Sequence, residues 1–407
     1  MLLKNQFFIA AGIFLAFIAG FFSFSKNADA AMPEVIWAEE VLLVSDETNP
    51  LLVTGGDAAL KGYKKIIAQA LTRKLHEARD AGKLPFTLKE DTETYEYAGV
   101  FDDAGEPPVA LIPLAIISDA LRSEYPVKDQ TYRKSVVVGS LYLAICKGGS
   151  TANNWIMVGG IPISGYTILG NDLNNLRTSI SKKEEADAYV AAMEKVINEK
   201  LDFRDLGRYL KNLKSKKMPD TYEVMEVSLS SQKSGEIFGN QQNKIKALLG
   251  CFYSSKFQEK TKTVVYPPIA MTGKNTGGDM SNAGNKSAAD DVADTIYSLT
   301  GGKSASGATM TISLPNPDHK IYLDFAGAAW QELQTKKESY IVKNYGYKAL
   351  LKSRIDNQPE KSADDVKSVQ YIIPQSGSVE SFHRKQLPDI FTELLIRLSD
   401  RLATGKK

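Results

Sequence analysis

The stretch VVVGSLYLAICKGGSTANNWIMVGGIPISGYTIL, residues 136–169, decides the fold. Residues 136–145 and 155–169 are apolar at consecutive positions, whereas residues 147–154 consist mainly of Gly, Ser, Thr and Asn, which favour turns. Successive side chains of a strand point to opposite sides, so an uninterrupted apolar strand must be covered on both faces. The stretch therefore predicts a β-hairpin in the middle of a sheet, within an α/β or α+β fold.

Shorter patterns before this hairpin complete a first mixed region. Residues 35–37 and 41–44 are apolar and predict buried strands. A helix is expected to begin near Asp57, a residue type that caps helices. Its apolar face would consist of Leu60, Tyr63, Ile67, Ala70, Leu71 and Leu75, which recur at helical spacing. Residues 109–121 are apolar but contain Pro113, which predicts a strand that leads into a helix.

Residues 179–217 have a helical pattern with a break near Leu201. The stripe before the break contains Ala186, Tyr189, Val190, Met193, Val196 and Ile197, and the stripe after it contains Phe203, Leu206, Leu210 and Leu213. Each helix of such a pair has one apolar face that needs a partner surface. The pair is therefore expected to cover a sheet or to join two halves of the chain.

A second mixed region follows. Residues 222–227 and 263–266 predict strands on either side of a helix at 243–257. Alternating apolar residues predict half-buried strands at 310–314 and 321–325.

The rest of this region is expected to be helix and loop. Helices are predicted at residues 287–299, at 330–351 and after Pro388, and residues 356–368 are polar and predict a loop. Residues 272–287 are rich in Gly, Asn, Ser and Thr and predict a mobile surface loop.

These patterns predict two mixed sheet-and-helix regions joined by a helical pair, after a cleaved signal peptide. The expected division is a leader at 1–30, a first domain at 31–178, a connector at 179–218 and a second domain at 219–407. Residues 57–117 and 243–271 share an order of helix, strand and proline-marked apolar segment, which indicates either an internal duplication or a chance similarity of the kind common in α/β proteins. In outline, this succession resembles the periplasmic domains of the curli-secretion and TolB type, although no motif residue of those families is present to transfer a site.

The amino terminus has the three parts of an export signal. Lys4 is followed by the largely apolar residues 7–24, and the small-x-small triplet Ala28-Asp29-Ala30 predicts cleavage between Ala30 and Ala31. The alternative is an uncleaved anchor, because eighteen residues of helix span about 27 Å, just enough for a bilayer core. We therefore expect an exported protein, periplasmic, extracellular or in the cell envelope, with membrane contact only through an uncleaved leader.

Composition narrows the class further. The 407 residues include 43% hydrophobic and 24% charged residues, values typical of a folded soluble protein. The net charge of +2 gives no global attraction to nucleic acid, so no nucleic-acid partner is expected. Export permits a disulfide between Cys146 and Cys251, and the alternative is two buried free thiols.

Familiar catalytic and cofactor motifs are missing from the sequence. Gly302-Lys303-Ser304 ends like a phosphate loop, but Tyr297 occupies the position of its first glycine. His76, His319 and His383 are isolated from one another, so neither a metal site nor a cofactor is predicted and catalytic residues stay unknown. A Ser-His-Asp relay stays open, since its members need not be close in sequence.

Two tryptophans are candidate binding residues. Trp155 follows Asn153 and Asn154 at the expected hairpin tip, and Trp330 follows the strand that contains Asp324; the alternative is that each anchors the core. The leading hypothesis is an exported cell-envelope protein that binds a partner protein or an envelope polymer, with no enzyme activity favoured. The alternative is an exported hydrolase with dispersed catalytic residues, for which the 272–287 loop would form a lid.

Overall fold

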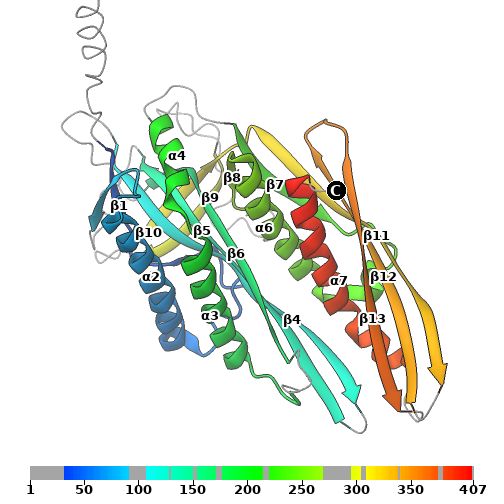
Figure 1. Ribbon diagram of the computed structural model, residues 1–407. Helices are drawn as coiled ribbons and strands as arrows, with labels where there is room; N and C mark the ends of the chain where they lie inside the picture. The colour runs from blue at the N-terminus through cyan, green and yellow to red at the C-terminus, as the bar shows by residue number, and fades with distance from the viewer. Residues whose placement is uncertain are drawn as a thin grey trace, which may run out of the picture.

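The computed structural model describes residues 32–90, 107–127, 130–149, 154–170, 177–213, 220–268, 295–303, 309–337, 340–374 and 379–405. These residues form two β-sheets and two layers of helices, stacked alternately (Figure 1). One helical layer covers the outer face of the first sheet, and the other lies between the two sheets. The mixed sheet-and-helix architecture expected from the sequence is thus present.

The first sheet, sheet A, contains the predicted central hairpin. Its strand order is β3-β1-β4-β5-β6-β10-β9, with β2 also beside β4. The bounds are β1 Glu34–Trp37, β2 Leu42–Leu43, β3 Thr87–Glu90, β4 Val109–Val127, β5 Gln130–Gly148, β6 Asn154–Leu169, β9 Thr295–Lys303 and β10 Thr309–Pro315. The short strand β1 runs parallel to β3 and β4, whereas β4, β5 and β6 form an antiparallel meander.

The second sheet, sheet B, repeats this arrangement. Its order is β13-β12-β11-β7-β8, with bounds β7 Thr221–Ser228, β8 Val264–Tyr266, β11 His319–Lys337, β12 Tyr340–Ile355 and β13 Lys361–Pro374. Strand β7 is parallel to β8 and β11, and β11, β12 and β13 are antiparallel. The order β8-β7-β11-β12-β13 and its strand directions match β3-β1-β4-β5-β6, so the two halves share one topology.

The helices occupy corresponding places in the two halves. Their bounds are α2 Gly56–Asp80, α3 Lys182–Lys200, α4 Leu206–Leu213, α5 Ser234–Phe238, α6 Gln242–Thr261 and α7 Val379–Thr404, with 3-10 turns η3 Phe203–Asp205 and η4 Gly239–Gln241. Helices α2 and α3 pack on one face of sheet A, and α6 and α7 pack between its other face and sheet B (Figure 1). Within each half, one helix follows the first strand and another follows the meander.

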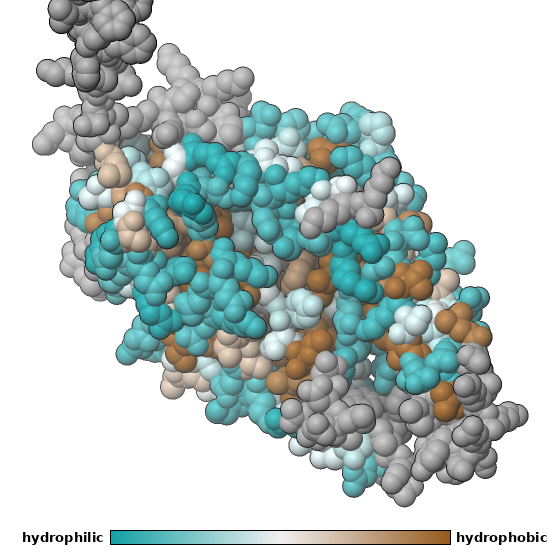
Figure 2. All heavy atoms as spheres, in the orientation of Figure 1, coloured by the Kyte–Doolittle hydropathy of each residue, from teal (hydrophilic) through white to brown (hydrophobic). Residues whose placement is uncertain are grey.

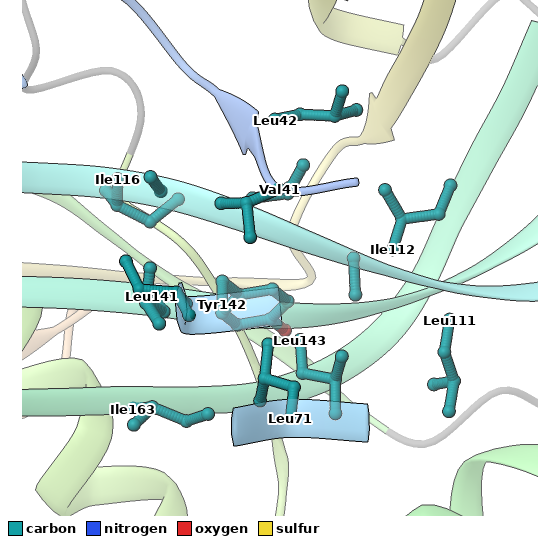
Figure 3. Packing of buried hydrophobic residues seen from close by; sticks show 14 of the residues in the cluster. Val41, Leu42, Leu71, Leu111, Ile112, Ile116, Leu141, Tyr142, Leu143 and Ile163 are labelled. Carbon is teal, nitrogen blue, oxygen red and sulfur yellow. The ribbon is translucent and has the colours of Figure 1, made fainter. Parts of the chain in front are cut away.

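Burial explains why the central hairpin is apolar throughout. Every residue of β5 from Ser135 to Cys146 is buried, because helices cover both faces of sheet A. Figure 3 shows Leu143 of β5 and Ile163 of β6 beside Leu71 of α2 in the first core cluster. The predicted hairpin is present, and burial on both faces is confirmed for β5, whereas in β6 Tyr166 is exposed and several residues after Gly160 are half-buried.

Sheet B confirms the other strand pattern. In β11, Ile321, Leu323 and Phe325 are buried, whereas Tyr322 and Asp324 between them are half-buried. Alternation of this kind is expected where only one face of a sheet packs against helices.

The expectation of a helix after Pro113 is wrong, because β4 continues through it as one strand. Strand β1 pairs with Ala110 and Leu111, and β2 pairs with Leu114 and Ala115. Pro113 lies in the gap between these two short neighbours, where its missing N–H removes no hydrogen bond from the sheet.

Two further expectations in the second half are wrong. Residues 330–351 form parts of β11 and β12 rather than a helix, and most of residues 356–368 belongs to β13 rather than to a loop. In β12 the inward side chains of Tyr347, Ala349 and Leu351 are buried at a spacing of two residues. The sequence of β13 is polar even on its inward face, because its inward Asp365 and Lys367 form ion pairs with Arg397 and Glu393 of α7.

Some expectations fall wholly or partly outside the described residues. These are the leader at 1–30, the 272–287 loop and residues 287–294 of the predicted helix; the remainder of that helix, from Thr295, is strand β9 instead. Within the described residues, no helix is both long and apolar enough to cross a membrane.

Specific polar contacts join sheet A to the second half. The Tyr142 hydroxyl of β5 donates a hydrogen bond to the Val265 carbonyl oxygen of β8 over 2.8 Å. Lys134 of β5 lies 2.5 Å from Asp389 and 3.6 Å from Glu393, both on α7. Burial raises the pKa of the Asp389 carboxyl, although the neighbouring Lys134 opposes the change.

Candidate binding groove

The outer edge of β6 is only partly covered. Strand β10 pairs with β6 at Asn154, Trp155 and Ile156, and no other described strand pairs with the rest of that edge. A groove of about 900 Å³ lies along residues 161–167 of β6, between α3 and the helices α6 and α7. Figure 2 shows apolar and weakly polar atoms, brown and white, along the furrow between the two hydrophilic lobes on this side.

Backbone contacts reveal which residues of β6 direct their hydrogen-bonding groups into the groove. Gln258 Nε2 of α6 donates to the Gly160 carbonyl oxygen over 2.6 Å, and Ser255 Oγ donates to the Pro162 carbonyl oxygen over 3.5 Å. Carbonyl groups of a strand alternate between its two edges, so the backbone groups of Ser164, Tyr166 and Ile168 point the same way. Pro162 has no N–H, which suits a position on an uncovered edge.

The side chains of these same residues face α6 and α7. Ser164 Oγ lies 2.9 Å from Ser140 Oγ and 3.4 Å from the carbonyl oxygen of Cys251 on α6. The ring of Tyr166 lies 6.0 Å from that of Phe252, and Tyr166 is 45% exposed. Together with Ile396 of α7, these two rings give this wall of the groove an apolar surface.

The opposite wall is α3, which approaches β6 closely at Gly165. A Cβ atom added at Gly165 would lie 2.7 Å from Cγ2 of Val196, so a larger residue would displace the helix. Lys195, Glu199 and Lys200 of α3 are exposed along the rim of this wall.

Ion pairs neutralise much of the remaining rim. Lys256 lies 2.7 Å from Glu259 and 3.9 Å from Asp400, and Lys262 lies 3.0 Å from Asp205. The hydrogen bond from Lys256 lowers the pKa of the Glu259 carboxyl, and the charge of Lys200 lowers it further. Among the described residues, no carboxylate lies within 4.0 Å of the Lys195 or Lys200 ammonium.

The chemistry of this groove favours binding over catalysis. Its two serine hydroxyls contact backbone carbonyl oxygens, and no histidine is among its described lining residues. A strand edge with unused N–H and C=O groups is instead suited to hydrogen-bonding another extended chain.

The structure places the two predicted tryptophans away from this open edge and from each other. Trp155 is 0% exposed and pairs with Ile312, so the expectation of an exposed binding residue there is wrong. Trp330 is half-buried, 6.0 Å from the ring of Phe391, with Lys233 Nζ 3.6 Å from its ring centroid. Trp155 is therefore a core residue, whereas Trp330 is partly buried and packs against the margin of the second core cluster.

The cysteines are free and buried, which leaves the disulfide alternative without support. Cys251 contacts the side chain of Ser140, and burial raises the pKa of its thiol to about 12. Cys146 lies six residues after Ser140 on β5, which places it about 20 Å from Ser140 at about 3.3 Å per residue. A disulfide requires Cα atoms within about 7 Å, so this fold cannot join the two cysteines.

The three histidines lie in different places. His76 lines a second cleft of about 780 Å³ on the outer face of α2, and Nδ1 of His383 lies 2.8 Å from the Tyr347 hydroxyl. His319 Nδ1 lies 2.7 Å from Asp356 Oδ2, but no serine or cysteine of the described residues hydrogen-bonds to this histidine. No three His, Cys, Asp or Glu side chains in the described part of the chain are placed to hold a metal ion.

Sequence reasoning missed the groove, although a signal for it exists. None of the sixteen residues of β6 is charged, and the strand contains Pro162 and Gly165. The corresponding strand β13 contains Lys361, Asp364, Asp365 and Lys367 in fourteen residues. Charges on an edge strand discourage pairing with another chain, so their absence from β6 marks it as an edge open to pairing.

Comparisons of the chain with protein-family models, curated proteins and solved structures found no match.

Proposed function

We propose that this protein is an exported cell-envelope binding protein whose groove accepts an extended segment of a partner protein. The segment adds a strand to sheet A along the edge of β6. The observation that carries the proposal is the edge of β6 that no described strand covers, with the backbone groups of Ser164 and Tyr166 directed into a groove.

The dimensions of the edge suit a short segment. Gln258 and Ser255 already occupy the carbonyl groups of Gly160 and Pro162, so pairing is available from residue 163 to Leu169. Seven residues at about 3.3 Å each give an edge of about 23 Å, enough for a peptide of about six or seven residues.

The recess of the edge favours a single strand over a whole sheet from a second copy. Helix α3 forms one wall, and α6 and α7 form the other. A second copy that presented its own β6 would bring its own two walls against these, whereas an extended peptide fits between them.

The cellular location in this proposal rests on the leader at residues 1–30. Mass spectrometry of the protein from its native host is expected to find a chain that begins at Ala31. An intact Met1 on a protein recovered from the cytoplasm would contradict the envelope assignment and leave the groove without its proposed partners.

Photo-crosslinking in native cells tests the binding proposal. A photoreactive phenylalanine analogue at Tyr166 is expected to capture one defined protein, whereas the same analogue at Val366, 54% exposed on β13, captures none. In the Tyr166 probe background, Ser164→Pro removes an edge N–H and should abolish capture. The control Ser164→Ala removes only the hydroxyl and should retain it. Capture of an envelope polymer instead, or capture that Ser164→Pro leaves unchanged, would refute the proposal.

A second candidate, an exported hydrolase, is favoured by the His319–Asp356 pair, since a histidine oriented by a carboxylate can act as a general base. If this candidate is correct, a screen of ester, peptide and glycan substrates should find turnover that His319→Ala abolishes. Turnover that His319→Ala leaves intact, or no turnover at all, would remove the candidate.

A further inference from the structure

We infer that the partner's segment is amphipathic, with apolar side chains at alternate positions and an acidic side chain opposite Gly165. This inference rests on the proposed function and adds the chemistry of the partner. It follows from the different surfaces that the two walls of the groove present to alternate residues of an added strand.

Residues that face each other on neighbouring strands have side chains on the same side of the sheet. Partner residues opposite Ser164 and Tyr166 therefore face α6 and α7. There they meet the rings of Tyr166 and Phe252 and the side chain of Ile396. Burying an apolar side chain on such a surface contributes about 25 cal/mol per Å², so this side of the segment is apolar.

The partner residue opposite Gly165 faces α3 instead. Val196 lies directly over Gly165, and Lys195 is the neighbouring exposed residue of the groove lining. No described carboxylate lies within 4.0 Å of the Lys195 ammonium, so an acidic partner residue would complete an ion pair here. A basic residue at this position would be repelled.

The other rim charges of α3 lie toward the closed end of the groove. Going back along β6 from Gly165 to Gly159, the facing residue changes from Val196 to Tyr209, so the chain after α3 lies toward the start of β6. Glu199 and Lys200 are therefore nearer to Pro162 and the closed end than Lys195 is. Lys200 also interacts with Glu259, as the lowered pKa of that carboxyl indicates.

Three labelled peptides test the inference by fluorescence anisotropy with the full chain purified from its native host. The first, TVEVT, spans residues 163–167 of the edge and places glutamate opposite Gly165 and valines opposite Ser164 and Tyr166. The second, TVKVT, differs only by lysine for glutamate, and the third, VTETV, has the composition of the first but places threonines opposite Ser164 and Tyr166. The glutamate peptide is expected to bind about fivefold more tightly than the lysine peptide, with the difference shrinking in high salt.

Charge reversal in the protein provides the matched comparison. Lys195→Glu should reverse the preference between the first two peptides, whereas Lys200→Glu, at the closed end, should leave the glutamate peptide favoured. Both side chains are exposed, so neither change is expected to alter the fold.

The outcomes separate this inference from the proposed function. Equal binding of the first and second peptides, or of the first and third peptides, would overturn the inference. Capture of a defined protein at Tyr166 combined with no binding of any peptide would overturn the inference and keep the proposed function. A Tyr166 adduct with the mass of two copies of this chain would overturn both.

Discussion

Sheet A and sheet B have one topology but different surroundings. Helices cover both faces of sheet A, and its central strand β5 is buried without interruption from Ser135 to Cys146. Helices α6 and α7 cover one face of sheet B, and its equivalent strand β12 alternates buried Tyr347 and Ala349 with exposed Lys348. The number of covered faces, rather than the position of a strand in the sheet, therefore determines its sequence pattern.

The outer strands differ for a related reason. Strand β6 is uncharged and lies between two helical walls, whereas β13 is charged, with Val366 54% exposed. No described helix packs on the other face of sheet B, and this free face carries ion pairs such as Lys348–Asp364 at 2.8 Å. A polar face of this kind is also found on the end repeats of solenoid proteins.

The largest effect is expected from truncating one leucine on each of the two middle strands. Leu143→Ala removes a fully buried side chain of β5 and should lower the free energy of unfolding by about 3 kcal/mol. Leu350→Ala removes a half-buried side chain from the free face of β12 and should cost less than about 1 kcal/mol. Urea titration of both variants checks this, and equal losses would contradict the one-sided cover of sheet B.

Replacing a glycine on each of the same two strands should again destabilise β5 more than β12, by a smaller amount than the leucine variants. A Cβ added at Gly139 of β5 would lie 2.0 Å from Cε2 of the buried Tyr189, so Gly139→Ala should destabilise the protein by about 2 kcal/mol. At Gly346 of β12 the nearest atom is Cδ1 of the exposed Leu333, at 3.3 Å, so Gly346→Ala should be within about 0.5 kcal/mol of neutral. Thermal unfolding of the pair measures both, and a neutral Gly139→Ala would show that α3 does not pack as closely as described.

Two aspartates should contribute to the pH dependence of stability with opposite signs. Burial between the layers raises the pKa of Asp389, so this carboxyl keeps its proton to higher pH in the folded state than in the unfolded chain. Its contribution to stability therefore falls as the pH rises above the ordinary pKa of an aspartate. The backbone N–H of Lys320, together with His319, lowers the pKa of Asp356, whose contribution is present above the ordinary value and lost as pH falls.

The corresponding asparagine variants test these signs. Between pH 7 and pH 3, Asp389→Asn should become progressively less stable relative to the native protein, whereas the deficit of Asp356→Asn should shrink. Urea titrations across this pH range measure the stability of each variant relative to the native protein. If both differences changed with pH in the same direction, the opposite pKa shifts of the two aspartates would be contradicted.

The smallest effects on stability are expected at the outer strands. Tyr166→Lys and Val366→Lys place the same charge on exposed positions of β6 and β13 and should each change the free energy of unfolding by less than about 0.5 kcal/mol. Only Tyr166→Lys should abolish binding of the glutamate peptide, because a charged edge strand resists pairing. Loss of binding in both variants would show that the two edges are not distinct.

Sequence patterns predicted strands correctly where both faces of the strand are covered, or where apolar and polar residues strictly alternate. The hairpin of β5 and β6, the alternation of β11 around Leu323 and the helices α2, α3, α6 and α7 were all predicted. Prediction failed for β12 and β13, where polar inward residues such as Asp365 and Lys367 are compensated by charges on α7. It failed at Pro113 because the gap between β1 and β2 is a property of the assembled sheet.

The candidate groove, too, could be predicted from the sequence only in part. An uncharged strand containing Pro162 and Gly165 could be found in the sequence, because edge chemistry is a local property of residue types. The open edge of this strand could not be found in the sequence. It depends on the pairing of β10 with β6 ending at Ile156 and on where α6 and α7 pack.

The amino-acid sequence by itself determined the mixed architecture, the two-sided core strand and the absence of familiar catalytic motifs, because apolar spacing and residue type act locally. Only the tertiary structure decided that two halves stack through a shared helical layer, that the cysteines lie apart and that no described strand pairs with most of the outer edge of β6. These features depend on contacts between residues far apart in the chain, and no local pattern encodes which surfaces meet.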